Sequence, residues 1–196
     1  MPQPTVSHKG LIIAHVALGS NATSSAGAPK FTLQEVKKAL SCDSVKVLAD
    51  SRFFSSPAFP AGSGPDYVNA AVTVETSLSA DALLAHLHRV EADFGRVREA
   101  RWAARTLDLD LLDYGGAIVP DEAMVSYWVD LPLERQMKEA PGQLILPHPR
   151  MQDRAFVLIP LADIAPDWVH PMTGQSLTEL LSALPDAEKR TICPLE

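Results

Sequence analysis

Two aspartates separated by one residue, Asp108 and Asp110, are the side chains of this sequence best suited to chemistry, within the segment RTLDLDLLD. Successive side chains of a β-strand point to opposite faces, so the leucines would face a core and both carboxylates would share the other face, about 6–7 Å apart. Mg²⁺ takes one or two such carboxylates and completes its shell with water and phosphate oxygens. The alternative is a solvated strand face that carries two acids.

Four arginines precede this strand within ten residues, although the chain as a whole is acidic. Guanidinium groups match phosphate oxygens and stay charged at every relevant pH. Beside two carboxylates they would neutralise a polyphosphate while the acids hold its metal ion. The alternative is a solvated basic loop, but an indole in this loop favours binding, because a flat heterocycle can stack on it. These residues are Arg96, Arg98, Arg101 and Arg105, with the indole of Trp102.

A second group lies around the Pro/Gly loop that starts near residue 55. Tyr67 and Asn69 are two residues apart and would share one strand face. The Asn69 amide offers donors and an acceptor, which fits the amide edge of a heterocycle, or it is a buried amide satisfied by backbone. Three phenylalanines either belong to the core or wall a flat ring, and one of the first two must be core because neighbours on a strand face opposite ways. They are Phe53, Phe54 and Phe59.

A third group begins at His148, which stands between two prolines that stiffen its backbone. This imidazole can donate to a phosphate, or it can bond to its own loop. Arg154 and Phe156 follow soon after as a candidate anion partner and a candidate ring contact.

The elements that must position these groups follow from hydrophobic periodicity. Their order, β-α-β-β-α-β, predicts an α+β fold of the ferredoxin-like type, with an antiparallel sheet and both helices on one face. The first helix has capping-box spacing at Thr32 but could begin a turn earlier, and Ser79 is placed to cap the second. The predicted strands are residues 11–18, 45–54, 67–75 and 107–113, and the predicted helices run to about Leu40 and from Ser79 to Gly95.

The remaining segments add a C-terminal extension to this core. Residues 155–164 predict an apolar helix with Pro160 inside it or at a kink, and residues 177–184 predict one more short helix. Residues 121–141 show no clean periodicity and are interpreted as an inserted loop. We expect a flexible N-terminal tail over residues 1–10 and a single domain over residues 11–196.

Composition restricts the class of protein. The 196 residues carry a net charge of −7, which argues against general nucleic-acid binding. The start of the chain lacks the apolar core of a signal peptide, and the apolar runs are shorter than the roughly 20 residues of a membrane helix. Two cysteines are too few for a disulfide framework. We therefore expect a cytoplasmic protein, a monomer, with neither nucleic-acid nor membrane partners.

Several segments together resemble the 6-hydroxymethyl-7,8-dihydropterin pyrophosphokinase family. The most specific are the R-T-L-D-L-D and P-H-P-R…R-A-F pieces, in this order and spacing, and the matches span most of residues 11–170. The matching segments are HVALGSN at 15–21, Phe54 to Pro57, PDYVNAAV at 65–72, VEADFGRVR at 90–98, RWAARTLDLDLL at 101–112 and LPHPRMQDRAFVLIPLADIAP at 146–166.

The resemblance implies transfer of pyrophosphate from ATP to the hydroxymethyl group of 6-hydroxymethyl-7,8-dihydropterin, with AMP as the second product, in folate biosynthesis. It implies two Mg²⁺ ions on Asp108 and Asp110, with Arg96 and Arg105 in catalysis beside them. On the ATP side it implies His88, Glu91, Arg98, Trp102, Arg105, Leu111, His148 and Arg154. On the pterin side it implies Ser56, Pro57, Ala58, Phe59, Tyr67, Asn69 and Phe156.

Two other functions fit part of the pattern. A nucleotidyl- or glycosyltransferase would also use a D-x-D pair with Mg²⁺ but would not need a flat-ring pocket at Tyr67 and Asn69. A non-catalytic ferredoxin-like binding module would have no reason to gather two acids and four arginines on one side. The chain also departs from the family at Ala103-Ala104, where Gly-Pro is frequent, and at Ser56 and Ala58, where Thr and Pro are common.

Overall fold

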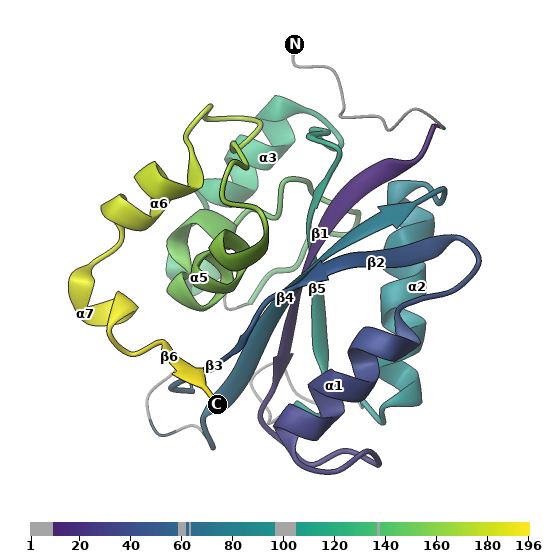
Figure 1. Ribbon diagram of the computed structural model, residues 1–196. Helices are drawn as coiled ribbons and strands as arrows, with labels where there is room; N and C mark the ends of the chain where they lie inside the picture. The colour runs from purple at the N-terminus through teal and green to yellow at the C-terminus, as the bar shows by residue number, and fades with distance from the viewer. Residues whose placement is uncertain (1–9, 59–61, 63, 97–104, 137) are drawn as a thin grey trace.

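The computed structural model describes residues 10–58, 62, 64–96, 105–136 and 138–196. Within these residues the chain forms an antiparallel sheet with helices on both faces (Figure 1). The strands are β1 (Ile12–Ser20), β2 (Val45–Asp50), β3 (Phe53–Ser56), β4 (Tyr67–Thr76), β5 (Asp108–Tyr114) and β6 (Cys193–Leu195). The α-helices are α1 (Pro29–Ala39), α2 (Ala80–Asp93), α3 (Glu122–Val129), α4 (Leu133–Gln136), α5 (Ala155–Ile164), α6 (Leu177–Ala183) and α7 (Asp186–Lys189), and a 3₁₀ turn covers Met151–Asp153.

Strand β1 lies at the centre of the sheet, between β4 and β5. On the edge that faces away from β1, β4 pairs with β2 along its C-terminal half and with β3 along its N-terminal half. The single strand predicted over residues 45–54 is therefore wrong in one respect: it is two strands. Ser51 lies at the break and still bonds to β4, because its hydroxyl accepts the backbone N–H of Ala71 at 2.8 Å.

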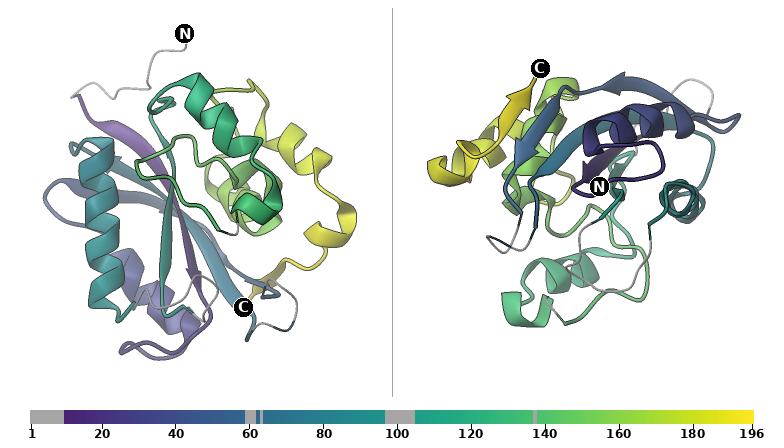
Figure 2. Two further views of the ribbon diagram at one scale, coloured as in Figure 1. Left: turned by 180° about the vertical axis from the view of Figure 1, so that it is seen from behind. Right: turned by 90° about the horizontal axis from the view of Figure 1, so that it is seen from below.

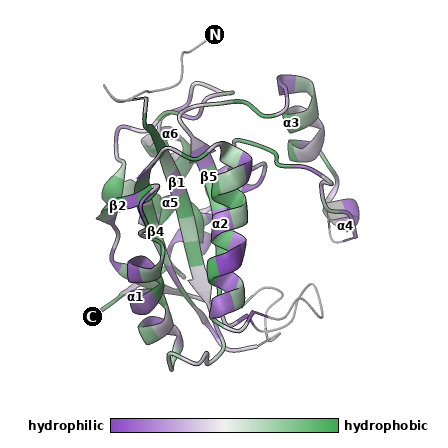
Figure 3. Ribbon diagram, turned by 90° about the vertical axis from the view of Figure 1, so that its right-hand side faces the viewer, coloured by the Kyte–Doolittle hydropathy of each residue, from purple (hydrophilic) through white to green (hydrophobic). Residues whose placement is uncertain are grey.

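Two hydrophobic clusters cover the two faces of the sheet. The first packs α1 and α2 against one face, as the sequence predicted, and includes Leu107, Leu109 and Leu111 of the β5 region. The second packs α5 and α6 against the other face. Figure 2 shows the same arrangement from two further sides, with α1 and α2 on one face and α5 on the other. In Figure 3 β1 is largely apolar whereas α2 carries both apolar and polar residues, as expected for a buried strand and a surface helix.

The helix starts confirm the cap at Ser79 and, of the two starts left open for the first helix, the earlier one. Ser79 caps α2, since its hydroxyl accepts the backbone N–H of Ala82 at 3.3 Å. Helix α1 begins at Pro29 rather than behind a Thr32 cap, because proline already has the helical φ and needs no amide partner at that position. Thr32 is buried inside the helix, and its hydroxyl bonds to that of Ser24 at 2.7 Å.

The C-terminal part contains the two predicted helices and further structure. Pro160 lies inside α5, and α6 starts with a capping box between Ser176 and Glu179. Strand β6 adds to the sheet by pairing with β3. Residues 121–141 contain α3 and α4 rather than loop alone; that they are an insertion stays a prediction. No helix of the described ranges is both long and apolar enough to cross a bilayer.

A bidentate ion pair fastens α5 to the turn between β2 and β3. Arg52 donates from Nε and Nη2 to Asp163 at 2.9 and 2.7 Å, and these bonds lower the pKa of the Asp163 carboxyl. A carboxyl whose folded pKa is depressed stabilises the fold above its unfolded pKa of about 3.9, and this contribution is lost as pH falls through the folded pKa.

We expect Asp163→Asn to lower Tm slightly at pH 7, because exposed pairs contribute little, and we expect this deficit in Tm to shrink in melts below pH 4. A deficit that is constant with pH would contradict an electrostatic origin.

Candidate active site

The end of β1 places an amide and a carboxylate on either side of a glycine. Gly19 pairs with Asn69 on β4 and with Asp108 on β5, and side chains directly opposite one another on neighbouring strands share a face. A Cβ at Gly19 would lie 3.7 Å from Asn69 Oδ1 and 3.8 Å from Asp108 Cβ. Because Gly19 has no side chain, only backbone lies between Asn69 and Asp108, and we call this backbone surface the floor of the site. No local pattern in the sequence marks Gly19 for this role, because its partners lie on two other strands.

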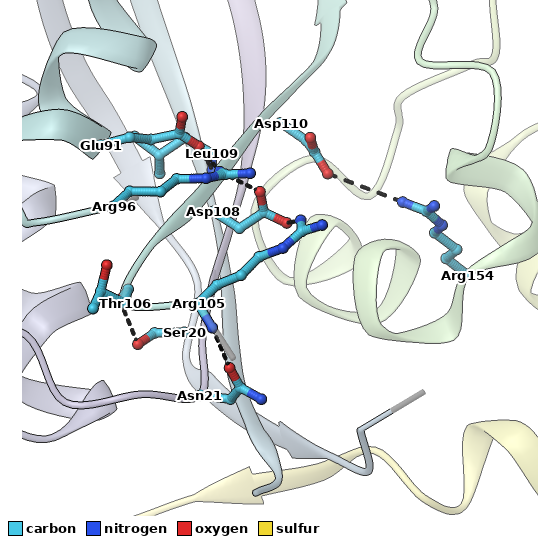
Figure 4. A network of polar contacts seen from close by, with 10 residues as sticks. All are labelled: Ser20, Asn21, Glu91, Arg96, Arg105, Thr106, Asp108, Leu109, Asp110 and Arg154. Carbon is cyan, nitrogen blue, oxygen red and sulfur yellow. Dashed lines mark hydrogen bonds and ion pairs between the residues drawn. The ribbon is translucent and has the colours of Figure 1, made fainter. Parts of the chain in front are cut away.

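Asp108 and Asp110 project from the same side of β5, as the alternation predicted (Figure 4). Asp108 bonds to Arg96 with one oxygen and to Arg105 with the other. Asp110 forms a longer ion pair with Arg154, at 4.0 Å. The two carboxylates, which come from a single strand, thus lie among guanidinium groups from three segments of the chain.

Glu91 connects α2 to β5 and to the arginines around the two carboxylates. Its side chain is only 2% exposed, and Oε1 accepts the backbone N–H of Leu109 at 2.8 Å and also a bond from Arg96. The same Arg96 nitrogen reaches Asp108, so Glu91 holds the guanidinium in place above the strand. His88, Glu91 and Arg96 also line one cavity of ≈ 230 Å³, which brings two of the residues expected on the ATP side next to an arginine expected to act in catalysis.

Asn21 anchors the start of the β5 segment. Its side-chain oxygen accepts the backbone N–H of Arg105 at 2.7 Å, and its amide nitrogen donates to the carbonyl of Pro65 at 3.1 Å. Asn21 therefore links the end of β1, the loop before β4 and Arg105, whose guanidinium bonds to Asp108. The only sequence signal for this residue is its place directly behind an apolar strand, which does not reveal partners far along the chain.

The charges around Asp110 keep its carboxyl ionised. Burial alone would raise the pKa of Asp110, but the opposing effects of His148, Arg154, Arg105 and Arg96 are larger together, and the pKa lies below its usual value. Burial lowers the pKa of the His148 imidazole, with Asp110 acting in the opposite direction. Burial also lowers the pKa of Arg154, whose guanidinium nevertheless stays protonated.

His148 bonds to its own loop, which is one of the two roles that the sequence left open. Its Nδ1 accepts the backbone N–H of Arg150 at 3.1 Å, so the neutral ring carries its proton on Nε2. One ring nitrogen therefore bonds to the loop, and the other is a donor that a phosphate oxygen can use.

The residues expected on the pterin side form a second cluster across β3 and β4. The Asn69 amide is 4% exposed and donates to the Ser56 hydroxyl at 2.9 Å, so a side chain, rather than backbone, satisfies it. Tyr67 pairs with Ser56, and burial raises the pKa of its phenol, which stays neutral. Phe156 is partly buried, with the Arg154 guanidinium 5.7 Å above its ring.

The other predicted site residues are exposed, belong to the core or lie outside the described residues. Ala58 is buried, whereas Pro57 is exposed. Both early phenylalanines serve the core, Phe54 in the second cluster and Phe53 against the first. Leu111 also has its side chain in the first cluster, on the face opposite the carboxylates, so only its backbone could meet a nucleotide. Phe59, Arg98, Arg101 and Trp102 lie outside the described residues.

An antiparallel α+β fold that gathers arginines around two neighbouring carboxylates is suited to a protein that handles phosphate groups. A protein-family model named 7,8-dihydro-6-hydroxymethylpterin-pyrophosphokinase (HPPK) matches residues 15–166. The chain belongs to this family of diphosphotransferases.

Individual relatives agree with this assignment. The chain is 37% identical over 177 residues to the 2-amino-4-hydroxy-6-hydroxymethyldihydropteridine pyrophosphokinase of Haemophilus influenzae, which covers 90% of this chain and 95% of the relative. The enzyme of the same name from Synechocystis is 44% identical over 117 residues, 60% of this chain and 50% of the relative. The crystal structure of wild-type HPPK-DHPS from Plasmodium falciparum gives a TM-score of 0.59 at 13% identity and covers 87% of this chain and 43% of that one. The similarity to the Plasmodium falciparum structure concerns the fold alone. The chain spans 50% of the Synechocystis enzyme and 43% of the Plasmodium falciparum chain.

Proposed function

We propose that this chain transfers a pyrophosphoryl group from ATP to the hydroxymethyl oxygen of 6-hydroxymethyl-7,8-dihydropterin, which yields AMP and the dihydropterin pyrophosphate for folate biosynthesis. The observation that carries the proposal is the row Asn69, Gly19 and Asp108 across three neighbouring strands. This row joins an amide that suits a lactam edge to carboxylates that suit a metal-bound polyphosphate, with no side chain between them.

Asp108 and Asp110 have the chemistry needed to hold two Mg²⁺ ions. Both are partly exposed carboxylates on one strand face, and oxygen is the donor that Mg²⁺ prefers. No group of three or more His, Cys, Asp or Glu suited to a metal occurs among the residues described, which fits an ion that completes its shell with substrate phosphates and water. When bound, the ions would neutralise charge on the β- and γ-phosphates.

The protein's contribution to the transfer is positioning and charge neutralisation. The hydroxymethyl oxygen attacks the β-phosphorus and releases its proton to solvent, the bond from that phosphorus to the α,β-bridging oxygen breaks, and AMP leaves with that oxygen. Arg96 and Arg105 lie beside Asp108 and would stabilise the charge that develops on the transferred group. His148, through its Nε2 proton, and Arg154 approach from the Asp110 side.

The flat ring would lie against β3 and β4. Asn69 would pair with the lactam edge of the pterin, and the Ser56 hydroxyl keeps its amide in one orientation. Tyr67 and Phe156 would contact the ring. The further residues that we assign to this pocket are Pro57, Ala58 and Phe59, and those that we assign to ATP are His88, Glu91, Arg98, Trp102 and the backbone of Leu111.

The fold type and the oligomeric state concern the chain as a whole. The element order β1-α1-β2/β3-β4-α2-β5 and the sheet order β5-β1-β4 support a ferredoxin-like core within one domain. We propose that the partners are the two small substrates and that the chain acts as a monomer.

The direct test is incubation with ATP, Mg²⁺ and the hydroxymethyl-dihydropterin, followed by chromatography of the nucleotides. We expect AMP and one pterin pyrophosphate in equal amounts. ADP as the product would indicate ordinary kinase chemistry. Turnover with a sugar or nucleotide acceptor instead would favour a different D-x-D transferase, and no turnover with any acceptor would favour a binding module.

Substitutions at Gly19 test the shape of the floor. A methyl group at this position meets its neighbours at ordinary contact distances, so Gly19→Ala should fold with an almost unchanged Tm. Gly19→Leu should also fold, because its longer side chain points into the site, but its KM for the pterin should rise at least about tenfold since the added atoms occupy the place of the ring. An unchanged KM in Gly19→Leu would place the substrate elsewhere.

A further inference from the structure

A second cavity lies at the other end of the central strands. It has a volume of ≈ 690 Å³, and its lining includes Ile13, His15, Asp113, Ile164, Trp168 and His170. His15 precedes Gly19 by four residues on β1, which separates them by about 13 Å. None of the residues assigned above to ATP, pterin or Mg²⁺ lines this cavity.

His15 presents a hydrogen-bond acceptor to the cavity. Its side chain is 6% exposed, and Nδ1 lies 3.4 Å from Asp113 Oδ2. A ring nitrogen beside a carboxylate carries the proton. Asp113 itself is held in place because its other oxygen accepts the backbone N–H of Gly116 at 3.1 Å. In the tautomer that carries its proton on Nδ1, the lone pair lies on Nε2, for which no hydrogen-bond partner occurs within the described part of the chain.

His170 presents a donor. It is 3% exposed, and its Nδ1 accepts the backbone N–H groups of Met172 and Thr173 at 3.3 and 3.4 Å. Burial lowers the pKa of this imidazole, so the ring is neutral at pH 7 with its proton on Nε2. This Nε2–H likewise has no partner among the described residues. Two ring nitrogens of opposite hydrogen-bonding character, on residues that are 6% and 3% exposed, thus remain for a ligand.

The walls of the cavity suit a flat ring. The indole of Trp168 makes T-shaped contacts with both imidazoles, with centroid distances of 6.4 Å to His15 and 5.6 Å to His170. Ile13 and Ile164 add apolar surface. Concave sites with mostly apolar walls and a few convergent polar groups are typical of small-molecule sites, and the volume lies in their range.

We propose that this cavity binds a small planar heterocycle through a cyclic amide edge. The ring N–H of the ligand donates to His15 Nε2, and the neighbouring carbonyl accepts from His170 Nε2–H. A metal ion fits less well, because Nδ1 of His170 is used by backbone N–H groups and its Nε2 carries the proton. A phosphate fits less well because the Asp113 carboxylate would repel it.

The proposal can be tested with 1-methyluracil, which has one ring N–H between two carbonyls, and with 1,3-dimethyluracil, which lacks that N–H. Titration of the full chain, followed by NMR of the histidine ring nitrogens, should shift the Nε2 signals of His15 and His170 in a saturable way. The dimethyl compound should bind at least about tenfold more weakly, since His15 then loses its donor. This contrast needs no variant, and it does not depend on the pyrophosphokinase activity.

Variants assign the two hydrogen bonds. His15→Leu and His170→Leu should each weaken 1-methyluracil by about tenfold. His86→Leu is the matched control, because His86 is another buried histidine whose ring bonds to the carbonyl of Leu40 at 2.9 Å, away from both sites. Equal affinity for the two uracils, shifts confined to His148, or no saturable shift at all would overturn the proposal.

Discussion

Replacement of Asp110 with alanine is expected to lower kcat about a thousandfold while Tm changes by no more than a few degrees. A carboxylate that holds a catalytic metal contributes several kcal/mol to transition-state stabilisation, and each 1.36 kcal/mol corresponds to about a factor of ten in rate. Stability should change little because the Asp110 side chain is 36% exposed and its ion pair with Arg154 is long, at 4.0 Å. Pairs of this kind contribute about 0–1 kcal/mol.

The measurement is AMP formation over a range of Mg²⁺ concentrations, with a thermal melt of the same preparation. Asp110→Asn should require more Mg²⁺ than the wild type, since it keeps the size of the side chain but loses the charge. Asp163→Asn is the matched control, because it removes an ion-paired carboxylate from α5 without touching the site. A large fall in Tm with turnover intact would show that Asp110 serves the fold instead.

The part of the fold that the sequence predicted rests on local signals. The alternation Leu107, Leu109, Leu111 is visible in one short segment, and so is the spacing from Ser79 to the amide that it caps. The break between β2 and β3 has no such signal, because it depends on Ser51 bonding across the sheet to Ala71. The pairing of β6 with β3 joins segments far apart in the chain, and such pairings have no local pattern.

The residues of the candidate site likewise include some with a local sequence signal and some without one. The paired aspartates and the arginines before them are neighbours in sequence, so their chemistry could be predicted together. Gly19 and Asn21 act through partners on other strands and loops, and only the sheet register reveals them. The resemblance suggested Leu111 for ATP, but strand alternation turns its side chain into the core, which limits it to a backbone contact.

Replacement of Arg96 or Arg105 with alanine is expected to lower kcat by about 10²–10³-fold each, the usual loss when one donor to developing charge is removed. The two variants should differ in stability. Arg96 bonds to Glu91, which is 2% exposed, so its removal leaves a buried carboxylate with less compensation, and this destabilises the fold. The Arg105 side chain is 29% exposed, and Asn21 holds the backbone of this residue independently of the guanidinium.

A second substitution separates the two effects of Arg96. Glu91→Gln removes the buried charge, so the double variant Arg96→Ala/Glu91→Gln should recover much of the Tm lost in Arg96→Ala, because the uncompensated carboxylate is gone. Its kcat should stay low, since the guanidinium that faces the phosphates is still missing. Arg96→Lys should keep part of the rate, because a positive charge remains but the forked geometry does not. The role in phosphate transfer would be refuted by an unchanged kcat when Arg96 and Arg105 are both replaced, measured at a temperature at which the double variant is fully folded.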